Sequence, residues 1–173
     1  MRMRSGVRKL VLSVHLVVSV GWIGAVGAYV AFDLTTVRSD DPDLLRSAYA
    51  GMDLVVQSVI VPLALATLLT GIIISLGTRW GMFRHYWVAI SLLLTSVATV
   101  VLLLETRTIG ALAEAAADPA TTRGELAGLN STLVHSVGGM VVLLAVLVLN
   151  VYKPRGLTRY GWRKQDQAVR DPA

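Results

Sequence analysis

Four long apolar stretches, separated by shorter polar connections, constrain the fold of this 173-residue chain more than any other feature. They cover residues 10–31, 54–77, 86–104 and 133–152. Each is close to the length of about 20 residues that an α-helix needs to cross a bilayer. Because only 16% of the residues are charged, the chain lacks the polar surface that a soluble domain requires. The sequence therefore predicts an all-α protein, a polytopic up-down-up-down four-helix bundle in which residues 1–173 form a single integral membrane domain.

Basic residues are distributed unevenly between the two ends of this predicted bundle. Twelve of the 16 Lys and Arg residues lie before the first stretch, in the second connection or in the tail 153–173. Because Lys and Arg favour cytoplasmic loops, this bias predicts a multi-pass protein of the bacterial cytoplasmic membrane. Both termini, including the basic tail 153–173, are then cytoplasmic. The net charge of +5 indicates contact with anionic lipid head groups of the bilayer rather than with nucleic acid.

The first and third connections contain signals for helices that continue beyond the apolar stretches. SDDPDLL, residues 39–45, is typical of a helix start with Pro42 in the first turn. We expect that second helix to run on through the membrane, with a kink at Pro62. Alanine-rich composition extends the third helix to about Ala117, and the fourth is predicted to start near Thr121 or Thr122. Helices 2–4 should therefore extend beyond the outer leaflet as a small cap.

One histidine lies inside the first apolar stretch, in the segment HLVVSVGWIG that begins at His15. His15, Ser19 and Trp22 are spaced so that they share one face of a helix. A histidine in a membrane helix is a candidate functional residue, here a ligand for a cofactor. The alternative is a neutral imidazole that hydrogen-bonds to a neighbouring helix. If a cofactor is bound, we expect it in the half of the bundle near the termini, with His15, then His85, and Trp22 beside it.

The spacing His-x6-Trp-x-Gly, formed by His15, Trp22 and Gly24, resembles the first helix of CopD-like membrane domains. It is also similar to the four-helix, haem-binding protoporphyrinogen oxidases of the HemJ type. The segments 62–107 and 149–165 more specifically resemble an uncharacterised family of actinobacterial four-span membrane proteins. The wider resemblance implies haem b or copper handling with His15 as a ligand. HemJ-type proteins carry a lysine where this chain has Ser91, which argues against protoporphyrinogen oxidation.

A second group of polar residues falls near one depth at the opposite end of the predicted bundle. Carboxylate and imidazole groups are ligand types for divalent metals, so His135, Asp53 and Glu105 form a candidate metal site. The alternative is a structural layer of hydrogen bonds and ion pairs where the helices leave the lipid. The whole group comprises Asp33, Asp53, Gln57, Glu105, Arg107, Asn130, Ser131 and His135.

No sequence motif for hydrolysis, phosphate binding or dinucleotide binding is present. The absence of cysteine excludes disulfides and thiolate metal sites. We interpret the Gly138–Gly139 pair as a site of close helix packing. The sequence favours a binding or accessory membrane protein, alone, as a homo-oligomer or with a membrane-protein partner. The alternative function is a b-type haem redox protein or a copper-handling protein.

Overall fold

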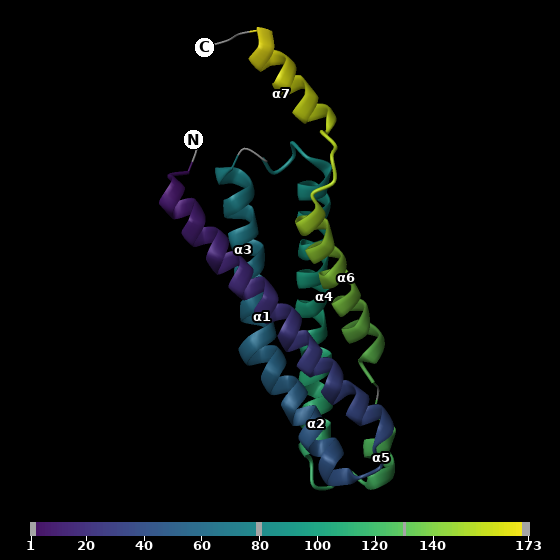
Figure 1. The fold of residues 1–173 in the computed structure, drawn as a ribbon. Coiled ribbons are helices and arrows are strands. Elements are labelled where there is room, and N and C mark those ends of the chain that lie inside the picture. Colours follow the sequence, from purple (N-terminus) through teal and green to yellow (C-terminus); the bar gives the residue numbers. More distant parts are fainter. Residues whose placement is uncertain (1–2, 79–80, 130, 171–173) are drawn as a thin grey trace.

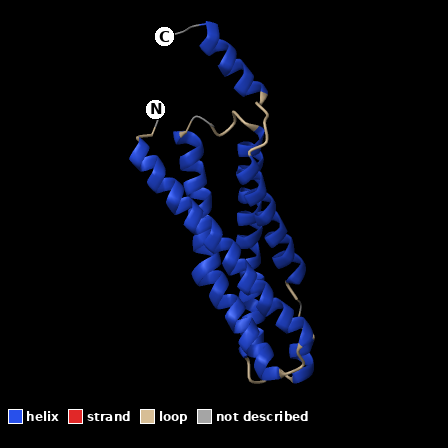
Figure 2. Ribbon diagram, in the orientation of Figure 1, coloured by secondary structure: helices blue, strands red, loops and turns tan. Residues whose placement is uncertain are grey.

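The computed structural model describes residues 3–78, 81–129 and 131–170, without the side chains of residues 165 and 168–170. Within these ranges the chain is helical, and its only β-type pairing is an isolated bridge between His85 and Leu157. Figures 1 and 2 show the arrangement of the helices. The elements are α1 (Ser5–Arg38), α2 (Pro42–Val55), the π-helical turn η1 (Val56–Ile60), α3 (Val61–Gly77), α4 (Tyr86–Ala117), α5 (Arg123–Ala127), α6 (Leu133–Tyr152) and α7 (Arg159–Arg170).

Four of the described helices are long and apolar enough to cross a membrane: α1, the continuous α2–η1–α3 helix, α4 and α6. The α1 helix packs against α2, α3 and α6, and α4 packs against the same three helices from the other side. Both chain termini lie at one end of the bundle, as Figure 1 shows. The predicted all-α four-helix membrane bundle is therefore confirmed.

The α2–η1–α3 helix departs from α-helical geometry immediately before Pro62. In η1, the N–H of Val61 donates to the carbonyl of Val56, five residues earlier, which widens the turn. Proline lacks an N–H, and its ring would clash with the carbonyl four residues earlier in a regular α-helix. The wide turn accommodates Pro62 while the helix continues, so the irregularity falls in the turn that precedes the proline.

The ends of α1 and α4, together with α2 and α5, form a helical cap beyond the apolar spans (Figure 1). As predicted, α2 begins at Pro42 and α4 ends at Ala117. The fourth membrane helix does not start near Thr121 or Thr122: Thr122 caps only the short α5, which ends before Gly128, and α6 starts at Leu133. Glycine has a low helix propensity, and the hydroxyls of residues 131 and 132 bind another helix, which ends α5 early.

A reciprocal capping box fixes the start of α5. The backbone N–H and the hydroxyl of Thr122 both donate to Glu125 Oε2, each at 2.8 Å, and the Glu125 N–H donates back to Thr122 Oγ1. These hydrogen bonds to the charged form lower the pKa of the Glu125 carboxyl. On the other side of α5, Leu126 is buried against the cap core with Leu45 and Met52.

The tail is attached to the second connection at the end of the bundle that holds the termini. The N–H of Thr158 donates to the Arg84 carbonyl at 3.1 Å, and the Thr158 hydroxyl donates to the Phe83 carbonyl. A side chain at Gly161 would collide with the Arg84 carbonyl oxygen, so only glycine fits at this contact. The α7 helix thus starts from a fixed point, and its Tyr160 and Trp162 side chains are exposed.

Candidate functional site: a pocket inside the bundle

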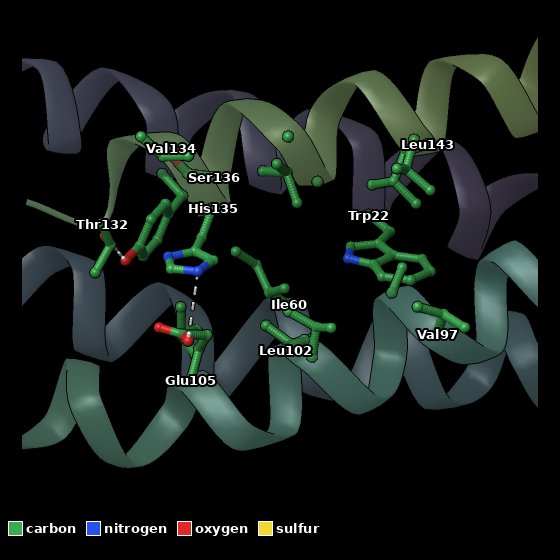
Figure 3. A pocket seen from close by; sticks show the side chains of 18 of the residues that line it. Trp22, Ile60, Val97, Leu102, Glu105, Thr132, Val134, His135, Ser136 and Leu143 are labelled. Carbon is green, nitrogen blue, oxygen red and sulfur yellow. Dashed lines mark hydrogen bonds and ion pairs between the residues drawn. The ribbon is translucent and has the colours of Figure 1, made fainter.

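A pocket of about 310 Å³ lies between the helices, in the half of the bundle away from the termini. Its size is at the lower end of the range of roughly 300–1,000 Å³ for small-molecule sites. Figure 3 shows Trp22 at one end of this pocket and Glu105 and His135 at the other. The wall between these ends is apolar and includes Ile60 and Leu102.

The pocket opens sideways, toward the surface that faces lipid in a membrane. The lining residues from α1 and η1, among them Trp22 and Ile60, are all buried. Those that remain exposed belong only to α4 and α6: Val97, Val101, Val134, His135 and Gly138. A molecule dissolved in the bilayer could therefore enter between α4 and α6 without crossing water.

Gly138 and Gly139 help to create this space. From the sequence we expected close helix packing at this pair, and that expectation is wrong. A Cβ placed on either residue would have no neighbouring atom within 4 Å, and both residues line the pocket. Close packing occurs instead at Gly21, whose Cβ would lie 3.3 Å from Leu63, so the helices approach there and stay apart at the pocket.

Glu105 from α4 and His135 from α6 face each other at the polar end of the pocket (Figure 3). The Nε2 atom of His135 lies 3.9 Å from Oε1 of Glu105, which is too long for a hydrogen bond. The imidazole is 59% exposed and the carboxylate 25% exposed. Among the described residues, neither side chain has a hydrogen-bond partner, so both can still bind a ligand.

Asp33 is fully buried at the junction of α1 and α6, where it is bound by two residues that line the pocket, Thr132 and Ser136. Its Oδ2 accepts hydrogen bonds from Thr132 at 2.9 Å and Ser136 at 2.8 Å, and its Oδ1 accepts one from Ser131 at 3.2 Å. The Tyr29 hydroxyl lies 2.7 Å from Thr132 Oγ1 and extends this network along α1. The carboxylate thus occupies the N-terminus of α6, where the helix dipole favours a negative charge.

The polar cluster predicted from the sequence is divided into separate groups in the structure. Within the described residues, Asp53 forms no hydrogen bond or ion pair with Glu105 or His135: Gln57 donates to its Oδ1 at 3.5 Å, and a Cβ at Gly110 would lie 3.9 Å from that oxygen. No group of three or more His, Asp or Glu side chains in the described ranges could hold a metal ion. Arg107 is exposed, and Asn130 lies outside the described residues.

His15 is half-buried and contacts the α3 helix. Its Nδ1 lies 2.8 Å from the Thr70 hydroxyl, and its ring packs against Gly71, where a Cβ would be 3.4 Å from the imidazole. The Ser19 hydroxyl donates to the His15 carbonyl at 2.6 Å, within α1. This geometry matches the alternative to cofactor binding, in which the His15 imidazole forms a hydrogen bond to a neighbouring helix.

His15 and Trp22, which were predicted to share one face of the first helix, lie in two different environments. Trp22 is buried and lines the pocket, whereas His15 contacts α3 two turns away. His85 precedes α4 and pairs through its backbone with Leu157, and its ring lies 6.5 Å from that of Trp87. The pocket therefore lies in the half of the bundle opposite the one in which we expected a cofactor.

Sequence reasoning did not identify Tyr29, Thr132 or Ser136 as site residues. A signal for them was present: Ser131 and Thr132 precede an apolar helix, Ser136 follows one turn later, and Asp33 stands alone in the last turns of α1. An isolated carboxylate in an apolar helix requires donors, and hydroxyls at a helix start supply them. Pairing the two features required knowledge of which helices are neighbours.

Comparisons with known proteins give no relative from which a function could be inferred. No protein-family model, curated protein or solved structure matches the chain. The resemblance to CopD-like and HemJ-type helices therefore stays a prediction. What the chain itself establishes is a multi-pass membrane protein built as a four-helix bundle, with four helices that can cross the bilayer.

Proposed function

We propose that this protein is a binding or accessory protein of the bacterial cytoplasmic membrane that takes up an apolar molecule from the bilayer. The observation that carries the proposal is the pocket between α4 and α6, which is lined mainly by aliphatic side chains and open toward lipid. Concave, largely apolar sites with a few polar groups at one end are typical of small-molecule binding.

The proposed orientation places both termini in the cytoplasm, on the basis of the twelve basic residues at that end. The polar end of the pocket, with Glu105 and His135, then lies at the outer surface of the membrane. Single cysteines introduced at Asp41 and Gln167 test this orientation in intact cells. An impermeant maleimide should label position 41 and should leave position 167 unlabelled until the membrane is opened. Labelling of both positions in intact cells would contradict the orientation.

Filling the pocket should strongly reduce the uptake of an apolar probe. We expect Gly139→Leu to fit without a backbone clash, because no atom lies within 4 Å of a Cβ at this position, and to occupy the space that the probe would use. The probe is a diazirine-bearing dodecane in nanodiscs, and the measurement is the yield of photo-crosslinked peptide from α4 and α6. The yield should fall about tenfold, since roughly 1.4 kcal/mol of apolar burial is lost.

Gly24→Leu is the matched control for this experiment. Gly24 is also in a membrane-spanning helix, is exposed and has no atom within 4 Å of a Cβ, but it does not line the pocket. Crosslinking in this variant should equal that of the unmodified protein. If the two variants are labelled equally, or if labelling is spread evenly over all lipid-facing residues, the pocket does not bind apolar molecules and the proposal is wrong.

A further inference from the structure

We infer that the ligand of this pocket is a single-chain lipid with an uncharged hydroxyl head group, such as a long-chain or isoprenoid alcohol. This inference rests on the proposed function and specifies its ligand. The polar end of the pocket provides one acceptor and one donor side by side, Glu105 and His135. The rest of the wall provides a place for an apolar chain.

A hydroxyl is the smallest head group that satisfies both side chains at once. It can donate to the Glu105 carboxylate and accept from the N–H of a neutral or charged His135 imidazole. The 3.9 Å separation of Nε2 and Oε1 is too long for a direct hydrogen bond but allows one oxygen to lie about 2.8 Å from both atoms, above the line that joins them. Such a hydroxyl would complete the hydrogen bonding that the pair lacks.

The charges around this end disfavour an anionic head group. Glu105 is one carboxylate, and the buried Asp33 is a second, bound by the lining residues Thr132 and Ser136 and by Ser131. Among the described residues that line the pocket there is no Lys or Arg to offset a phosphate or a fatty-acid carboxylate. A neutral donor such as a hydroxyl carries no charge to be repelled by these two groups.

The pocket also fixes the direction of the chain. From Glu105 to Leu94, the lining residues of α4 span eleven positions, or roughly 16 Å at 1.5 Å per residue. With its hydroxyl at Glu105 and His135, an alcohol of this length places the end of its chain beside Trp22, which lies at the far end of the pocket in Figure 3. The hydroxyl would lie near the membrane surface, where it could enter from the lipid without inversion.

Quenching of Trp22 fluorescence by a terminally brominated dodecanol tests both the head group and the direction. The matched probes are terminally brominated dodecane and terminally brominated dodecanoic acid, all in nanodiscs at pH 7. The signal from the pocket is the quenching that disappears in Trp22→Phe. We expect the alcohol to bind about tenfold more tightly than the hydrocarbon, the effect of one hydrogen bond to a charged acceptor, and the acid to bind most weakly.

Glu105→Leu should remove the preference for the alcohol while binding of the hydrocarbon is retained. Glu114→Leu is the control, because Glu114 is an exposed acidic residue on the same helix that does not line the pocket. Equal binding of alcohol and hydrocarbon to the unmodified protein, tighter binding of the acid, or an alcohol preference that survives Glu105→Leu would each overturn the head-group inference. Those results would leave the proposed function intact, because only the Gly139→Leu experiment decides whether an apolar chain binds.

Discussion

Replacing Asp33 with alanine is expected to lower the free energy of unfolding by about 2–4 kcal/mol. The substitution removes a fully buried carboxylate that accepts hydrogen bonds from Ser131, Thr132 and Ser136. A buried donor left without a partner costs roughly 1–3 kcal/mol. Ser136 retains its hydrogen bond to the Leu133 carbonyl at 3.1 Å. The expected loss of stability is therefore smaller than that of three donors left without a partner. Reversible unfolding in mixed micelles, followed by circular dichroism, measures the change.

Asp53→Ala is the matched control for the carboxylate. Asp53 is half-buried and accepts a single long hydrogen bond of 3.5 Å from Gln57, so its loss should cost less than about 1 kcal/mol. Asp33→Asn should fall between the two, since the amide keeps one acceptor oxygen but places an NH₂ group against hydroxyl donors. Equal destabilisation by Asp33→Ala and Asp53→Ala would show that the hydroxyl network does not hold α1 against α6.

Replacing Arg46 with alanine is expected to lower the free energy of unfolding by about 2 kcal/mol and to loosen the cap. Its guanidinium donates to three carbonyl oxygens: Ala116 in the last turn of α4, the C-cap Asp118 at 2.8 Å, and Thr121 in the loop that follows at 2.9 Å. Carbonyls at a helix C-terminus lack partners in the helix and carry a partial negative charge, so a cation that binds them, here those of Ala116 and Asp118, is stabilising. Hydrogen exchange at residues 116–121 should accelerate, and the same unfolding assay gives the free energy.

Arg46→Lys separates charge from geometry in this contact. An ammonium group retains the charge but cannot match the planar fork that reaches oxygens of three residues, so most of the loss should remain. Arg123→Ala is the control, because Arg123 is an exposed cation at the start of α5 in the same cap. If the lysine variant is as stable as the unmodified protein, the contribution of Arg46 is the charge near the helix end rather than the three hydrogen bonds.

The pocket illustrates how a pair of glycines can be interpreted in two ways from sequence. In α1, Gly21 lies against Leu63 of α3, as small residues in membrane helices predict. In α6, Gly138 and Gly139 are also glycines in a membrane helix, but no neighbouring atom lies within 4 Å of a Cβ at either position. Both residues line the pocket instead. The side chains on the opposite helix decide between contact and space, and these cannot be assigned before the helices are placed.

The second membrane helix shows how far local helix geometry can be predicted from sequence. Its continuity from Pro42 through the membrane follows from the absence of a breaker before Pro62, and the prediction of one continuous helix is confirmed. The π-helical turn at Val56–Ile60 was not predicted, because a proline can be accommodated by a kink or by a wide turn. The choice depends on packing, and Val56 and Ile60 are both buried in the core.

The sequence by itself determined that this chain is an all-α membrane bundle with four crossing helices and a helical cap, because length, apolar composition and helix start signals are local properties. It also singled out Asp33, Glu105 and His135 as polar residues at one depth. Only the tertiary structure decided that Asp33 is bound by hydroxyls of α6, that Glu105 and His135 face a pocket, and that Asp53 is bound by Gln57 instead. Depth along a helix is set by residue number, whereas the direction a side chain faces depends on how the helices rotate and pack against one another.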